Sequence, residues 1–103
     1  MRHLTHPPLD LIDRTAALVE KARKLRRKGE TRKAVVALRE ACLVSENQPS
    51  VWCLYGALLA EIGKREEAEN AFRQALWLRK REGDIARARV TQTLLDRVSQ
   101  LAA

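Results

Sequence analysis

Apolar residues recur at intervals of three and four along most of the chain, which is the spacing of one face of an α-helix. The pattern is interrupted at Gly29, at Asn47-Gln48-Pro49, at Gly63 and at Gly83. Glycine and proline end helices readily, so these interruptions separate five expected helices. The helices are expected at about residues 9–28, 30–45, 50–62, 65–81 and 84–101. No run alternates with a period of two, and the sequence therefore predicts an all-α fold.

When the sequence is aligned with itself so that Gly29 falls on Gly63, the first pair of expected helices superposes on the second pair. The aligned positions agree in size: Leu18 with Trp52, Ala22 with Gly56, Leu25 with Leu59, Gly29 with Gly63, Ala34 with Ala68, Leu38 with Phe72, and Ala41 with Ala75. Small residues allow crossing helices to approach, and large residues fill the space beside them. A period of about 34 residues is typical of stacked helix hairpins.

The second repeat resembles the tetratricopeptide repeat (TPR) family, whose pattern runs from Trp, Gly and Tyr on one helix to Ala and Phe on the next. The matching residues are Trp52, Tyr55, Gly56, Leu59, Gly63, Ala68, Phe72 and Ala75. Glu46 and Lys80 stand where the family often has proline. The resemblance implies a right-handed stack of antiparallel helix hairpins. It would form one domain over residues 9–103, with repeats at about 15–48 and 49–82, a capping helix at about 84–101, and a flexible segment before it at 1–8.

A stack of this kind implies a groove lined by the first helix of each pair, in which a peptide or helix of a partner protein binds. The implied groove residues are Val19, Arg23, Arg26 and Arg27 in the first repeat, Cys53, Ala57, Ala60 and Glu61 in the second, and Arg87 and Thr91 in the capping helix. Some relatives hold a carboxylate with Lys, Asn and Arg at set groove positions. Val19 and Cys53 replace polar members of that set, so this carboxylate clamp is not expected.

The formal net charge of +7 is concentrated in one run of the chain. Residues 21–33 hold eight basic side chains against the single acid Glu30. The eight are Lys21, Arg23, Lys24, Arg26, Arg27, Lys28, Arg32 and Lys33. Clustered cations attract polyanions and release counterions, so this basic run is a candidate surface for an acidic protein segment or a nucleic-acid backbone.

Helix stability alone is the alternative explanation of the basic run. Cations near the C-terminal end of a helix interact favourably with its dipole, which accounts for Lys24, Arg26, Arg27 and Lys28. Arg32 and Lys33 begin the next expected helix, where cations oppose the dipole and where the second repeat has Glu66 and Glu67. The dipole contributes only ~0.3–1 kcal/mol per charge, so both explanations stay open.

Two apolar residues lie off the expected buried stripe of their helices. Trp77 falls opposite Phe72 and Ala75, and Leu43 is its equivalent in the first repeat. Exposed aromatics often carry the energy of an interface, so both are candidate partner contacts. Packing of Trp77 against the capping helix or the amino-terminal segment is the alternative. Two repeats and one helix also fall short of the three repeats such arrays usually need, which makes a homodimer a further possibility.

Catalytic chemistry has no support in the sequence. His3 and His6 lack an acidic or cysteine ligand nearby, and the sequence holds no phosphate loop, nucleophile motif or metal cluster, so no enzyme, cofactor or metal is expected. Cys42 and Cys53 do not form a disulfide framework, and no export leader or membrane span is evident, which predicts a cytoplasmic protein. The leading hypothesis is a protein-interaction module, such as an adaptor, co-chaperone or assembly factor. Nucleic-acid binding through the basic run is the alternative.

Overall fold

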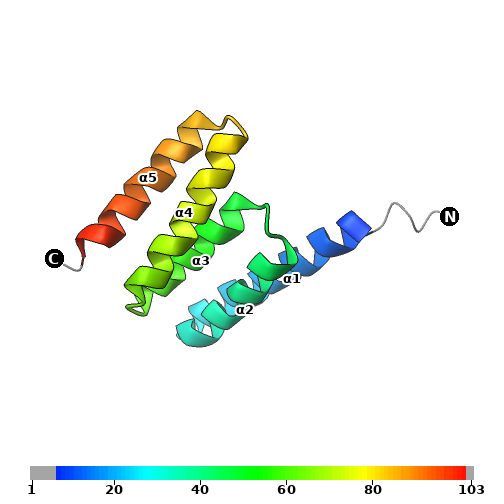
Figure 1. Ribbon diagram of the computed structural model, residues 1–103. Helices are drawn as coiled ribbons and strands as arrows, with labels where there is room; N and C mark the ends of the chain where they lie inside the picture. Colours follow the sequence, from blue (N-terminus) through cyan, green and yellow to red (C-terminus); the bar gives the residue numbers. More distant parts are fainter. Residues whose placement is uncertain (1–6, 102–103) are drawn as a thin grey trace. The chain divides into compact units, whose positions relative to one another are not determined.

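The computed structural model describes residues 7–101, which form five α-helices and no strand (Figure 1). The helices are α1 (Pro7–Arg27), α2 (Thr31–Val44), α3 (Pro49–Glu61), α4 (Arg65–Arg81) and α5 (Ile85–Gln100). The all-α prediction is confirmed, and every helix begins and ends within two residues of its expected bounds. His3, His6 and most of the segment expected to be flexible lie outside the described residues. Pro7 and Pro8 belong to the first turn of α1, where proline costs no helical hydrogen bond.

The chain divides into two compact units, one on each side of the junction between Glu46 and Asn47. Unit 1 holds the α1–α2 hairpin, and unit 2 holds α3, α4 and α5. In unit 2, α4 lies between α3 and α5 and packs against both of them.

The core of unit 1 is formed mainly by α2. Its buried residues follow one stripe of the helix: Ala34, Val35, Ala37, Leu38, Ala41 and Cys42. Ala22 of α1 is completely buried, as its expected place at the crossing of the two helices requires. The spacing by three and four predicts that Ile12 and Ala16 belong to the apolar face of α1, but both are exposed. That part of the expected stripe is therefore wrong.

In unit 2, α3 and α4 approach each other at Gly56 more closely than a side chain at that position would allow. A Cβ atom placed on Gly56 would lie 3.0 Å from Cε1 of Phe72, which is itself buried. The ring of Phe72 thus occupies the space that the missing side chain of Gly56 leaves. This arrangement confirms the sequence-based pairing of a small residue on one helix with a large one on the next.

The loops after α1 and α3 have the same geometry at equivalent positions of the two hairpins. Gly29 and Gly63 have φ of +82° and +81°, the left-handed conformation that glycine adopts without steric cost. The amide of Glu30 donates to the carbonyl of Leu25, and the amide of Lys64 donates to the carbonyl of Leu59, both at 2.9 Å. These bonds cap the last carbonyls of α1 and α3, as expected for a C-terminal glycine.

α5 begins with a side-chain cap, because Oδ1 of Asp84 accepts a hydrogen bond from the amide of Arg87 at 3.1 Å. This backbone hydrogen bond, with the nearby side chain of Arg87, holds the pKa of Asp84 below its usual value. The buried residues of α5 are Ala88, Thr91, Leu95 and Val98. The sequence also predicts Ile85, Val90 and Leu101 as apolar positions of this helix, and that prediction is wrong because all three are exposed.

Candidate partner-binding surfaces

The basic run lies on the C-terminal part of α1, the following loop and the first turn of α2, and all eight of its cations are exposed. Lys33 pairs with Glu30 at 2.9 Å, and Arg27 lies 3.7 Å from Glu20. Lys21, Arg23, Lys24, Lys28 and Arg32 make no ion pair with any residue in 7–101. The surface therefore keeps most of its positive charge uncompensated.

Glu30, the single acid of this run, titrates in a positive environment. Its pKa is lowered mainly by the hydrogen bond from Lys33 and then by the charges of Lys33 and Lys28. The carboxylate and ammonium groups lie at the surface, so the pair is screened by water and contributes little to stability. The lowered pKa of Glu30 indicates that the electrostatic field around this carboxylate is positive.

The groove residues expected on α1 do share one face of that helix. Val19, Arg23 and Arg26 are spaced by four and three residues, which places them on adjacent turns. Val19 is half-buried, while the arginines, with Arg27 beside them, are exposed. Unit 1 thus presents a half-buried apolar side chain beside three cations.

The groove residues expected in unit 2 are only partly accessible. Ala57 and Glu61 are exposed one turn apart on α3. Arg87 is exposed as well, but its Nη1 atom lies 3.1 Å from Oδ2 of Asp84, so its charge is paired. Thr91 is 0% exposed, which corrects its expected place in an open groove. Cys53 and Ala60 are half-buried.

A buried polar cluster explains the position of Thr91, and the sequence did not predict it. Arg79 of α4 is only 9% exposed, and its Nη1 donates to Oγ1 of Thr91 at 2.7 Å and to Sγ of Cys53 at 3.4 Å. The hydroxyl of Thr91 donates in turn to the carbonyl of Arg87 at 2.8 Å. Nε of Arg79 is buried and has no hydrogen-bond partner among the described residues. Arg79 makes no ion pair with them either, and the opposing charge that acts on it is the more distant carboxylate of Asp84.

The two apolar residues expected off the buried stripe are exposed, as predicted. Leu43 of unit 1 is 67% exposed and Trp77 of unit 2 is 53% exposed. The guanidinium of Arg81 lies 4.7 Å from the centre of the Trp77 ring, a cation–π contact on one face of the indole. Their expected role as partner contacts stays a prediction.

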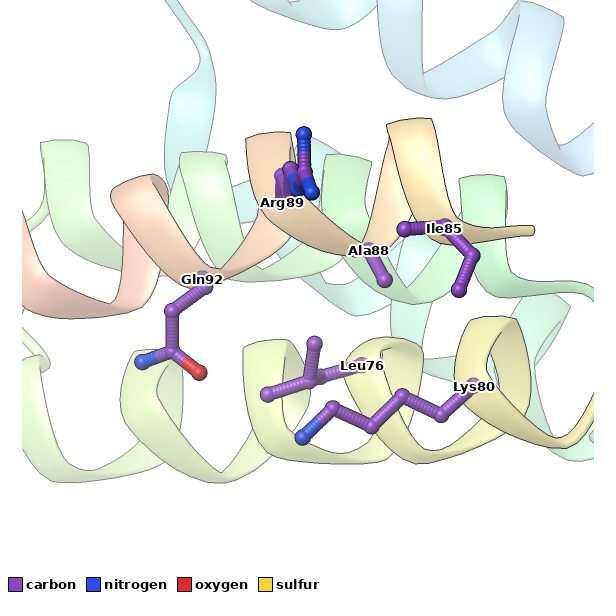
Figure 2. A pocket seen from close by; sticks show the side chains of 6 residues that line it. All are labelled: Leu76, Lys80, Ile85, Ala88, Arg89 and Gln92. Atoms are coloured by element: carbon purple, nitrogen blue, oxygen red, sulfur yellow. The ribbon is translucent and has the colours of Figure 1, made fainter. Parts of the chain in front are cut away.

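A groove between α4 and α5 is a further surface that the sequence did not reveal. It encloses about 410 Å³ and is lined mainly by apolar atoms. Its lining residues, drawn in Figure 2, are Leu76 and Lys80 of α4 and Ile85, Ala88, Arg89 and Gln92 of α5. We call it the α4–α5 groove. Ile85 could have pointed to this groove from the sequence, because it is a large apolar residue directly after the loop; in the structure its side chain is exposed.

The cysteines and acidic residues in 7–101 form neither a disulfide nor a metal cluster. Both cysteines are free thiols, and burial raises the pKa of Cys42 to about 12, which makes its thiolate inaccessible near neutral pH. No group of three His, Cys, Asp or Glu side chains in the described part of the chain is placed to hold a metal ion. None of its helices is long and apolar enough to cross a membrane.

The fold is that of a TPR-type array of helix hairpins, and comparison with solved structures supports this directly. The chain is similar to the second TPR of Spaghetti (RPAP3) bound to the HSP90 peptide SRMEEVD. The TM-score is 0.62 at 18% sequence identity, and the match covers 84% of each chain. No protein-family model and no curated protein matches the sequence. The likeness therefore confirms the expected fold.

Proposed function

We propose that this protein is an interaction module that binds an acidic peptide or helix of a partner protein through the basic face of unit 1. The observation that carries the proposal is the set of five exposed cations without ion pairs in the described structure. An acidic segment would neutralise them and release their counterions. Val19 would add an apolar contact beside Arg23 and Arg26.

The position of Arg32 favours a partner site over a purely structural role. This residue lies in the first turn of α2, which contains no acid, whereas the first turn of α4 holds Glu66 and Glu67. A cation at a helix N-terminus is unfavourable, so its presence costs stability that binding would offset. The structural neighbour carries a peptide, SRMEEVD, with three acidic residues. A partner segment of similar charge would suit the basic face of this chain.

The proposal extends to weaker contacts and to a cellular role. On unit 2, Glu61 and Arg87 would supply polar contacts. Ala57 of unit 2, Trp77 of unit 2 and Leu43 of unit 1 would supply apolar ones. The protein would act as an adaptor, co-chaperone or assembly factor. Its free thiols favour a reducing compartment such as the cytoplasm, which is where we place this role.

A direct binding measurement tests the proposal. A fluorescent, glutamate-rich peptide of about twelve residues is titrated with the protein and with the Arg23→Glu/Arg26→Glu/Arg27→Glu variant, and anisotropy is recorded. Because an acidic ligand loses affinity when the positive surface that binds it is reversed in charge, we expect at least a tenfold weaker Kd for the variant. Far-UV circular dichroism checks that helicity is unchanged. Equal affinity of both proteins would falsify the proposed surface.

A matched control and a competing ligand sharpen this test. The control variant Lys64→Glu/Arg73→Glu/Arg97→Glu changes the net charge equally, at exposed positions of unit 2 outside the α4–α5 groove, and it should bind the acidic peptide nearly as well as the wild type. Duplex and single-stranded DNA are titrated at two salt concentrations. Tighter, steeply salt-dependent binding of DNA would favour the nucleic-acid alternative over the peptide. Trp52, Tyr55 and Phe72 are half-buried or buried, so they offer no open stacking surface for bases.

A further inference from the structure

We infer that the α4–α5 groove binds an amphipathic helix of a partner protein that carries acidic residues beside its apolar face. This site is separate from the basic face of unit 1, and it rests on different residues. The inference is therefore independent of the proposed function, although both describe binding of acidic protein segments.

The shape of the groove suits a helix. Figure 2 shows Leu76 and Lys80, one turn apart on α4, facing the side chains of Ile85, Ala88 and Gln92 on α5. The α5 residues recur at intervals of three and four and so form one stripe along the groove. A volume of about 410 Å³ is within the usual range of ligand clefts, about 300–1,000 Å³. A helix that lies along such a stripe can place an apolar side chain in the groove at every turn.

The groove also lies where the repeat architecture leaves a helix without a partner. α1 packs against α2, and α3 packs against α4, so the first helix of each hairpin is covered by the second. α5 packs against α4 and contacts α3 at Thr91, but only α4 and α5 of the described residues line the groove itself. Ile85 is consequently 64% exposed at the edge of the groove, and Ala88 forms part of its floor. An incoming helix would cover both residues.

Charge decides which helix fits. Lys80 and Arg89 line the groove, both are exposed, and neither makes an ion pair with the described residues. No carboxylate of the described residues lines the groove. The nearby carboxylate of Asp96 accepts a hydrogen bond from the amide nitrogen of Gln92 at 2.9 Å. Glutamate or aspartate on the flanks of the partner helix would pair with the two free cations, whereas lysine would be repelled.

The test uses two designed helical peptides of about fourteen residues, with leucines spaced by three and four. The first has glutamates on the flanks, and the second has lysines at the same positions. We expect the glutamate peptide to shift the ¹⁵N–¹H signals of Leu76, Ala88 and Gln92 and to bind at least tenfold more tightly than the lysine peptide. Reversal of the groove charges by Lys80→Glu/Arg89→Glu should invert this preference.

Matched variants in the same unit separate the groove from general effects. Arg73→Glu/Arg97→Glu reverses two exposed cations, one on α4 and one on α5, that lie outside the groove, and it should leave binding within twofold. Ile85→Ser should weaken binding at least fivefold, whereas Val90→Ser, a similarly exposed position that does not line the groove, should not. All of these are surface changes that should leave the circular dichroism spectrum unaltered.

Several outcomes would overturn the inference. Equal affinity for both peptides, or equal effects of Ile85→Ser and Val90→Ser, would show that the groove does not select the ligand. Signal shifts confined to residues 21–33 would assign the acidic peptide to the basic face of unit 1, which would support the proposed function and exclude the groove. Shifts of the groove signals with protein concentration alone, matched by dimer mass in light scattering, would identify a second copy as the occupant. The Arg23→Glu/Arg26→Glu/Arg27→Glu variant should leave groove binding intact.

Discussion

The hairpins α1–α2 and α3–α4 have similar backbone geometry but differ in the side chains that they carry. Their loops repeat the same hydrogen bond at equivalent positions, and both cross at a small residue, Ala22 in one and Gly56 in the other. All Phe, Tyr and Trp residues of the chain lie in unit 2, whereas most of the excess positive charge lies in unit 1. Packing and turn residues thus determine the fold in both hairpins. Surface charge was free to diverge between them.

The largest expected effect on stability concerns the site in unit 2 where the ring of Phe72 packs against Gly56. Phe72→Ala should lower the free energy of unfolding by about 3–5 kcal/mol, because the buried ring leaves a cavity beside Gly56. Its counterpart Leu38→Ala should cost about 2–5 kcal/mol. Urea denaturation measures both: tryptophan fluorescence reports on unit 2, which holds both tryptophans, and circular dichroism reports on all helices. Leu43→Ala, at an exposed position, serves as the control and should change stability by less than about 0.5 kcal/mol.

The next effect tests whether the two crossings are interchangeable. Gly56→Ala brings a Cβ atom to 3.0 Å from the ring of Phe72, so it should destabilise by about 1–3 kcal/mol, despite the helix preference of alanine. The double variant Gly56→Ala/Phe72→Leu introduces the residue types that unit 1 has at the equivalent buried positions, Ala22 and Leu38. It should lose less stability than the sum of its two single changes. Strict additivity in the double-mutant cycle would show that the pair does not pack as described.

A smaller effect compares two buried charged groups of unit 2. Glu69 accepts hydrogen bonds from Arg65 at 3.3 Å and from Ser99 at 2.7 Å. Arg79 donates hydrogen bonds only to neutral groups, and its Nε has no hydrogen-bond partner among the described residues. Arg79→Met removes an unpaired cation from the interior, so it should raise the free energy of unfolding by about 1 kcal/mol. Glu69→Met removes a satisfied carboxylate and should lower it by a similar amount, measured by urea denaturation. A loss of stability in Arg79→Met would mean that its hydrogen bonds to Thr91 and Cys53 outweigh its burial.

The sequence predicted the helices well because their signals are local. Gly29, Gly63 and Gly83 each adopt positive φ at the end of a helix, and the buried stripes of α2 and α4 follow from spacing alone. The repeat period then related the two hairpins. No comparable local signal exists for α5, where Thr91 is buried and Val90 exposed although hydrophobicity alone ranks them in the opposite order.

The candidate surfaces were predictable only in part. The basic face of α1 follows from sequence because its residues are neighbours on one helix. Arg79 stands one turn after Ala75 and therefore on the buried stripe, but its burial depends on a hydroxyl and a thiol that two other helices supply. The α4–α5 groove depends on the line of contact between two helices, and no third helix of the described part of unit 2 lines it. Neither property is encoded by residue spacing.

The smallest expected effect addresses the charge difference that separates the two hairpins. Arg32 and Glu66 are equivalent positions at the starts of α2 and α4. Arg32→Glu should raise the free energy of unfolding by about 0.3–1 kcal/mol at low ionic strength, and Glu66→Arg should lower it by the same amount, because the helix dipole favours an acid at this end. Both shifts should shrink in high salt. If Arg32 is present for binding, Arg32→Glu must at the same time lower the affinity for the glutamate-rich peptide severalfold. A more stable variant with undiminished peptide affinity would leave the basic first turn of α2 without a function and would restrict the binding face to α1.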